Sequence, residues 1–318
     1  MMLTKNKKWI GMLADKPFIS KIMVFLGFCL LSMSLFTFIG FGIASLVFHL
    51  DLMNNPDLLS QYDQPGVVNA LKVIQTFSAI GLFIIPSIIS SLLFSSQPAA
   101  YLSFKKQPSF TSVLLVTLIL FLCLPFINWL IVLNQKFSLP AIFSGIEQWM
   151  KNSEEQAAKL TEVFLSTSSP GGLAINLIMI ALIPAIGEEL LFRGVLQRLL
   201  CDALKNSHIA ILISAAIFSA LHMQFYGFIP RMLLGVMFGY FLKWSNTLWL
   251  PIIGHFINNA TAVIFAFYAA KTDLPFNQDT IGTEPDDQVL LISTTIITIL
   301  CMLLFYRLTK KENPKIVL

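Results

Sequence analysis

Two acidic residues and an arginine interrupt a segment that is otherwise apolar. The run from Pro184 to Gly194 reads PAIGEELLFRG and contains Glu188, Glu189 and Arg193. Glu189 and Arg193 are four residues apart, so on a helix they share one face and their charges can pair. Glu188 lies about 100° round the helix from Glu189 and faces a different side. A carboxylate in such a setting is the kind of group that can take a proton from water.

Two of the four histidines also lie in apolar stretches. His222 follows Phe218 by one helical turn, and His255 precedes Asn259 by one turn. At about 1.5 Å per helical residue, three helices can bring Glu188 and these side chains into one layer away from water. A buried polar network that locks a helix bundle is the structural alternative. The remaining histidines are expected to be solvated at the edges of apolar stretches: His49 and His208.

Two small features adjoin the carboxylates. Pro184 has no N–H for the carbonyl of Ile180, so we expect the helix to open one turn before Glu188. Gly187 leaves room for a substrate backbone, for water or for a close-packed neighbouring helix.

The composition excludes most soluble classes of protein. Of the 318 residues 56% are hydrophobic and 12% are charged, whereas soluble domains carry about 25% charged residues. Mean hydropathy is +0.77. The net charge of +4 comes from basic residues beside apolar runs, so we expect no nucleic-acid partner. The cysteines are far apart and form no CxxC, which argues against a disulfide framework or a cysteine metal site: Cys29, Cys123, Cys201 and Cys301.

Apolar stretches predict an all-α, polytopic membrane protein with about eight transmembrane helices in one bundle. Each span must be helical because lipid offers the backbone no hydrogen-bond partners. The fifth and sixth are short for a bilayer core of about 30 Å. The expected spans are Ile22–Phe48, Val73–Phe94, Thr111–Leu133, Leu173–Leu199, Ile209–His222, Pro230–Leu242, Thr247–Ala269 and Val289–Tyr306.

Charge in the connecting segments predicts the orientation. The N-terminal and C-terminal segments are rich in lysine, whereas residues 270–288 hold five acidic residues and one lysine. Because positive segments stay in the cytoplasm, eight spans with both termini cytoplasmic fit the pattern.

The chain divides by function into three parts. Residues 1–172 form a three-span region that ends in a linker, 134–172, with apolar residues at helical spacing. That linker is expected to be an amphipathic helix on the outer surface or a solvated helix. Residues 173–269 are the expected catalytic core, and 270–318 hold an acidic loop and the last span.

The order of the polar residues on separate apolar helices resembles the CPBP family of intramembrane proteases. The pattern is EExxxR at Glu188–Arg193, then Phe218 with His222, then His255 with Asn259. This family includes the CAAX prenyl endopeptidases of the Rce1 type and the bacterial Abi proteins linked to bacteriocin self-immunity. The resemblance covers residues 173–269 and has no departure at the motif positions.

The resemblance implies a helix bundle with a cavity open to the cytoplasm and to lipid. It implies a membrane-embedded endopeptidase that acts on a membrane-associated protein or a hydrophobic peptide. Glu188 would activate water, flanked by His222 and His255. Asn259 would help to hold the oxyanion, and the site would be shaped by Glu189, Arg193 and Phe218.

Metal use stays open. Glu188, His222 and His255 are one carboxylate and two imidazoles, the donor set of a catalytic zinc, as in a metalloprotease. However, no HExxH presets two ligands on one helix face, so a glutamate–water mechanism without a cofactor is slightly favoured.

Two other functions compete with the protease. One is a non-enzymatic bacteriocin-immunity or scaffold protein that keeps the polar cluster for folding or partner binding. The other is a small transporter with a proton relay, against which the absence of internal repeats weighs. The expected location is a bacterial inner (cell) membrane. The sequence identifies neither the substrate nor the use of prenyl groups.

Overall fold

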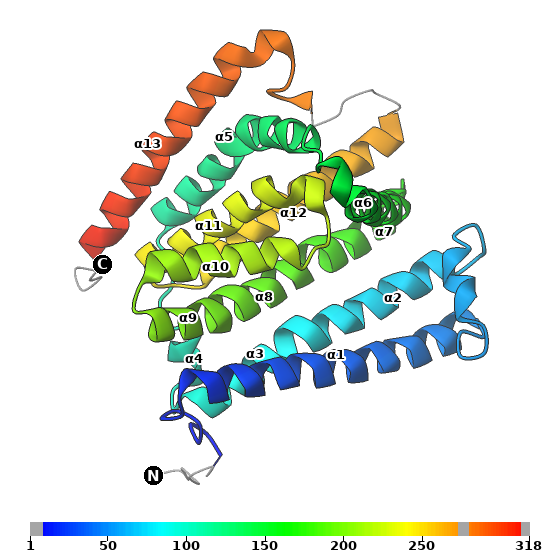
Figure 1. The fold of residues 1–318 in the computed structure, drawn as a ribbon, viewed down its shortest axis with the longest axis horizontal. Coiled ribbons are helices and arrows are strands. Elements are labelled where there is room, and N and C mark those ends of the chain that lie inside the picture. The colour runs from blue at the N-terminus through cyan, green and yellow to red at the C-terminus, as the bar shows by residue number, and fades with distance from the viewer. Residues whose placement is uncertain (1–8, 273–279, 313–318) are drawn as a thin grey trace. The chain divides into compact units, whose positions relative to one another are not determined.

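The architecture is known from a computed structural model that describes residues 9–272 and 280–312. Within those ranges the chain forms helices and turns and contains no β-strand (Figure 1). The all-α membrane fold predicted from the apolar stretches is confirmed.

Seven helices in the described part of the chain are long and apolar enough to cross a membrane. An eighth predicted span corresponds to α10, Ser207–Ala220, which has only 14 residues. At about 1.5 Å per residue it covers roughly 21 Å, less than the hydrocarbon thickness of about 30 Å. The seven long helices are Phe18–Phe48, Val67–Phe94, Phe110–Gln135, Pro170–Leu204, Phe225–Ser245, Trp249–Lys271 and Pro285–Lys311.

Packing divides the chain into two compact units. The first comprises Met1–Gln107 and Ile186–Ala210, and the second comprises Pro108–Ala185 and Ile211–Leu318. The boundary falls inside α8, Ile183–Glu189, so one helix contributes to both units. The functional division at residues 172 and 269 is a different kind of division and stays a prediction.

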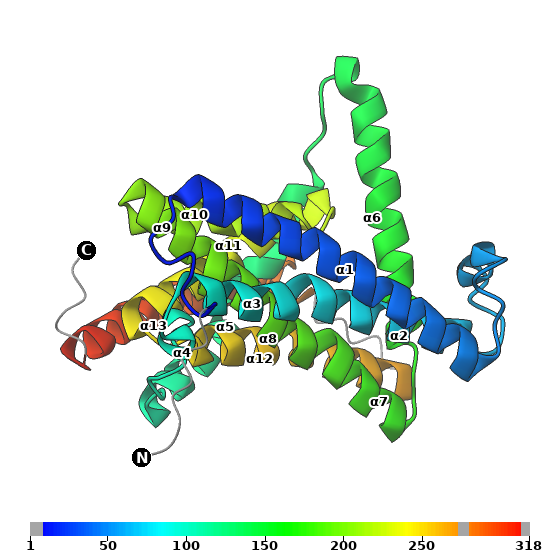
Figure 2. The same ribbon diagram turned by 90° about the horizontal axis from the view of Figure 1, so that it is seen from below.

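In the first unit, α1 (Phe18–Phe48) lies beside α2 (Val67–Ala79) and α3 (Ile85–Phe94) (Figures 1 and 2). A π-helical turn, Ile80–Ile84, joins α2 to α3. The short helix α4 spans Pro98–Tyr101. The rest of the unit continues α8 through a second π-helical turn, Leu190–Leu196, into α9, Gln197–Leu204.

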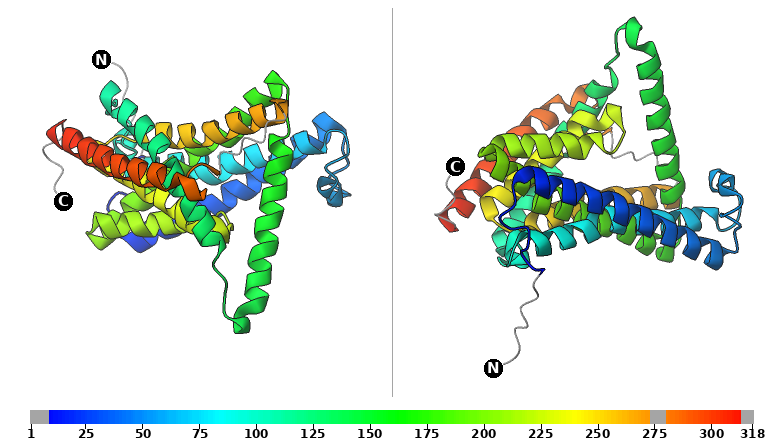
Figure 3. Two further views of the ribbon diagram at one scale, coloured as in Figure 1. Left: turned by 90° about the horizontal axis from the view of Figure 1, so that it is seen from above. Right: turned by 60° about the horizontal axis from the view of Figure 1, so that its bottom comes forward.

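In the second unit, an apolar core forms among four helices. They are α5 (Phe110–Gln135), α11 (Phe228–Ser245), α12 (Trp249–Thr272) and α13 (Gln288–Glu312). Helices α5 and α13 run side by side (Figures 1 and 3). A Cβ at Gly254 of α12 would lie 3.2 Å from Val116 of α5 and 3.3 Å from Phe238 of α11. Gly254 therefore permits the close approach of three core helices.

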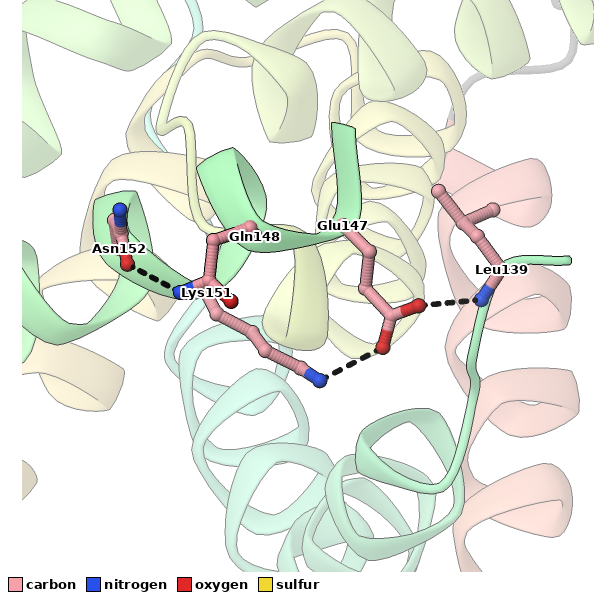
Figure 4. A network of polar contacts seen from close by, with 5 residues as sticks. All are labelled: Leu139, Glu147, Gln148, Lys151 and Asn152. Carbon is pink, nitrogen blue, oxygen red and sulfur yellow. Dashed lines mark hydrogen bonds and ion pairs between the residues drawn. The ribbon is translucent and has the colours of Figure 1, made fainter. Parts of the chain in front are cut away.

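The amphipathic linker is helical, as predicted, and forms α6, Ser144–Leu165. In two different views α6 runs across α12 and not along it (Figures 2 and 3). Its first turn is fixed by Glu147, which accepts the N–H of Leu139 at 3.2 Å and pairs with Lys151 at 2.7 Å (Figure 4). The hydrogen bond from Lys151 lowers the pKa of the Glu147 carboxyl. Whether α6 lies on the outer membrane surface stays a prediction.

The side of the membrane on which the C-terminus lies depends on whether the short helix α10 completes a crossing. With α10 as the eighth span both termini are on one side, and without it they are on opposite sides. We expect a reporter fused after Lys311 to be cytoplasmic and one inserted at Asp286 to be external. Labelling Asp286→Cys and Lys311→Cys from one side only, in a cysteine-free background, is an independent check. Equal access to both positions would exclude the eight-span topology.

Candidate active site

The glutamate–arginine pair predicted from the sequence is present and buried in the first unit. Arg193 Nη1 lies 2.8 Å from Glu189 Oε1, and their side chains are 1% and 0% exposed. Arg193 lies in the π-helical turn Leu190–Leu196, which directly follows the two glutamates. Such turns often occur at functional sites. The pair neutralises two charges that would be costly to bury singly.

Glu188 is also buried, with 8% of its surface exposed. The residue before it, Gly187, faces the π-helical turn Ile80–Ile84 of the same unit: a Cβ there would lie 2.8 Å from Phe83 Cβ. Phe83 also lies against Phe192, at 6.5 Å between ring centroids. Of the alternatives left open for Gly187, the structure supports close helix packing.

In the second unit Phe218 lies between the two histidines. His222 Nδ1 is 2.8 Å from the carbonyl oxygen of Phe218, and the Phe218 ring packs edge-on against both imidazoles, at 4.9 Å to His222 and 6.1 Å to His255. Because a carbonyl only accepts, this contact places a proton on Nδ1 of His222. The His255 ring also stacks on Phe238 at 5.4 Å. Both imidazoles are therefore held in defined orientations.

Asn259 contacts the helix that precedes the carboxylates. Its Nδ2 donates to the carbonyl oxygen of Ile180 at 3.0 Å, within the second unit. Asn259 Oδ1 accepts from Nδ2 of Asn258 at 3.1 Å. The amide is thus ordered by protein groups on both sides.

Residues of α5 and α6 hold the turn that follows His222. The Phe225 carbonyl accepts from Asn134 Nδ2 at 3.0 Å, and the Tyr226 N–H donates to Glu154 Oε2 at 3.2 Å. Trp149 packs on the Phe225 ring at 5.1 Å. The sequence pattern of 134–172 predicts a linker helix but does not indicate these contacts. The signal available in the sequence was the presence of Trp149 and Glu154 in the linker.

The structure supports part of the predicted arrangement. One unit contains Glu188, Glu189 and Arg193, and the other brings Phe218 into contact with both His222 and His255. The action of Glu188 with the histidines stays a prediction.

The donor types that a catalytic zinc requires are present in Glu188, His222 and His255. Among the residues that the structure describes, however, no three His, Cys, Asp or Glu side chains are grouped as metal ligands. The zinc site suggested by the sequence stays a prediction.

Comparison with known proteins shows that the central segment is similar to one family. Residues 170–261 match the family model described as type II CAAX prenyl endopeptidase Rce1-like. This match confirms the resemblance to CAAX proteases over a segment that contains Glu188, His222, His255 and Asn259. The protein is thus a multi-pass membrane protein, with a central segment that is similar to the Rce1-like family.

One curated relative is the uncharacterized protein YpbD of Bacillus subtilis. It is 33% identical over 89 residues, which are 27% of this chain and 42% of the relative. The chain therefore spans less than half the length of that protein. No solved structure matches the chain.

The buried ion pair predicts a large effect of a single substitution. Arg193→Ala removes the cation that pairs with Glu189 and leaves the carboxylate in a buried setting. We expect a loss of about 3–5 kcal/mol in the free energy of unfolding. Denaturation of the purified protein in detergent, followed by tryptophan fluorescence, measures this loss.

The matched control removes both charges. Glu189→Gln combined with Arg193→Met should recover most of the stability, because no lone buried charge remains. If Arg193→Ala unfolds like the wild type, the interaction contributes nothing and its inferred role is wrong.

Proposed function

We propose that the protein is a membrane-embedded endopeptidase that hydrolyses a peptide bond in a membrane-associated protein or a hydrophobic peptide. The observation that carries the proposal is the Rce1-like match over residues 170–261, which contains the carboxylate, both histidines and the asparagine on apolar helices. Peptide hydrolysis needs an activated water and a donor to the developing oxyanion, and these residue types supply both.

In the proposed reaction Glu188 takes a proton from water as the oxygen attacks the carbonyl carbon of the scissile bond. The carbonyl oxygen becomes an oxyanion and accepts a hydrogen bond from His255 and from the second amide hydrogen of Asn259. The proton then passes to the leaving nitrogen as the C–N bond breaks. The products are a carboxylic acid and an amine, which then ionise to a carboxylate and an ammonium.

The two imidazoles have separate proposed roles. His222 donates Nδ1–H to the Phe218 carbonyl, and this bond orients the imidazole that holds the attacking water while Glu188 takes its proton. His255 is stacked on Phe238 and edge-on to Phe218. This aromatic setting restricts rotation of the ring, so that it can donate in one direction.

The substrate class follows from the membrane setting. The family description names type II CAAX prenyl endopeptidases. We propose that this chain takes a membrane-anchored segment, in a bacterial cell membrane with both termini cytoplasmic. A prenylated peptide and an unmodified hydrophobic peptide of the same sequence test whether the lipid group is needed.

Single substitutions test the assigned roles. We expect Glu188→Gln, His222→Ala and His255→Ala each to reduce cleavage by at least about 100-fold, because each removes an acid–base or oxyanion group. The assay uses purified protein in lipid vesicles, with products identified by mass spectrometry.

Matched controls must separate loss of catalysis from loss of folding and from the effect of replacing any histidine. His49→Ala and His208→Ala change histidines outside the motifs and should retain near-wild-type cleavage. Unchanged thermal unfolding must accompany each loss of activity. Full cleavage by Glu188→Gln would eliminate the proposed base, and a folded wild type inactive on every membrane peptide would favour the immunity or scaffold function.

Metal removal separates the two chemical alternatives. In the proposed mechanism, cleavage persists after exhaustive dialysis against a chelator because the carboxylate and imidazoles act alone. Metal content and activity are measured on the same sample. About one zinc per chain, with activity lost on chelation and restored by zinc, would replace this mechanism with a zinc-dependent one.

A further inference from the structure

The helix that leads to Glu188 departs from α-helical hydrogen bonding just before it. Residues Leu177–Leu182 form a π-helical turn, after which the Ile183 N–H bonds to the Ile178 carbonyl, five residues back. In an α-helix the carbonyl of Ile180 would accept from residue 184. That residue is Pro184, which has no N–H to donate.

Asn259 supplies the donor that proline lacks. Its Nδ2 lies 3.0 Å from the Ile180 carbonyl oxygen, although the two residues are 79 positions apart in the chain. A carbonyl without a partner is costly in a hydrocarbon setting, where water cannot replace the missing bond. The hydrogen bond from the side-chain amide of Asn259 on α12 therefore replaces the backbone hydrogen bond that Pro184 cannot make.

The first unit contains a related contact, in which the bonded carbonyl lies one residue further from its proline. The π-helical turn Ile80–Ile84 is followed by Pro86, five residues after Gly81. Ser32 of α1 donates its hydroxyl to the Gly81 carbonyl at 2.6 Å. In both units a side chain from another helix thus bonds the carbonyl ahead of a proline, as expected for membrane helices.

We propose that Asn259 is a positioning residue, whose amide closes the proline-opened turn and so fixes the helix segment that carries Glu188. Ile180 precedes Glu188 by eight residues, about 12 Å along a helix. Asn259 follows His255 by one turn on α12. One hydrogen bond thus sets the register between the segment leading to the proposed base and the helix that carries His255.

This role is distinct from donation to an oxyanion. An amide nitrogen has two hydrogens, and Asn259 commits one of them to Ile180. The positioning role acts in the resting protein, so it affects unfolding as well as cleavage. Only its effect on cleavage rests on the proposed function.

A double-mutant cycle with Pro184 tests the inference. Pro184→Ala gives residue 184 an N–H for the Ile180 carbonyl, which makes the amide of Asn259 redundant there. We expect Asn259→Ala to lower the melting temperature by about 2–4 °C in the wild-type background and by much less in the Pro184→Ala background. Asn259→Leu, of similar volume and without a donor, repeats the test if the alanine variant folds poorly.

Two further cycles show that the coupling is specific. Ser32→Ala with Pro86→Ala should also unfold non-additively, because in that turn the Ile85 N–H bonds the Ile80 carbonyl, and with the same spacing an N–H at residue 86 faces the Gly81 carbonyl. Asn259→Ala with Pro86→Ala should be additive, because those residues share no carbonyl. Additive melting temperatures in the Asn259–Pro184 cycle would overturn the proposal.

Cleavage supplies the second readout. If Asn259 acts by positioning, the Asn259→Ala, Pro184→Ala double variant should cleave nearly as fast as Pro184→Ala alone. Asn259→Ala by itself should cleave much more slowly than the wild type. Restored stability without restored cleavage would overturn positioning as the main role and assign Asn259 to the oxyanion. The unfolding cycle needs no substrate, so failure of the proposed activity and failure of this inference are separate results.

Discussion

The structure depends on one constraint: polar groups inside an apolar helix bundle must be satisfied by other protein groups. The helix Pro170–Leu204 carries two buried glutamates, a buried arginine and an internal proline, Pro184. The buried charges and the carbonyl opposite the proline each need a hydrogen-bond or ionic partner, and lipid offers none. Two of these groups have identified partners, since Arg193 pairs with Glu189 and Asn259 bonds the carbonyl that Pro184 leaves open.

The same contacts that stabilise the helices also order the proposed catalytic groups. Phe218 bonds His222 through its carbonyl and packs on His255 through its ring, and Phe238 stacks on His255 as well. Catalysis by preorganised groups requires side chains that do not reorient during the reaction. A scaffold protein could use these contacts for folding alone, and for this reason activity and stability must be measured on the same variants.

The sequence predicted whatever depends on local spacing or on apolar length. The Glu189–Arg193 pair followed from an i, i+4 spacing, and the long spans and the amphipathic helix α6 followed from periodicity. Helix α10 was harder, because 14 residues are too few to identify a span by length. The partners of Ile180 and of the turn after His222 come from helices distant in sequence, so no local pattern could reveal them. Gly187 was compatible with several uses until Phe83 was located beside it.

The central claim is hydrolysis of a peptide bond by water that Glu188 activates inside the membrane protein. The most direct measurement incubates purified protein in lipid vesicles with a hydrophobic peptide in water enriched in heavy oxygen. The account predicts new C-termini that carry the heavy oxygen with the wild type and none with an equally folded Glu188→Gln variant. Peptides that stay intact with the wild type, or labelled products that form equally with the variant, would contradict it.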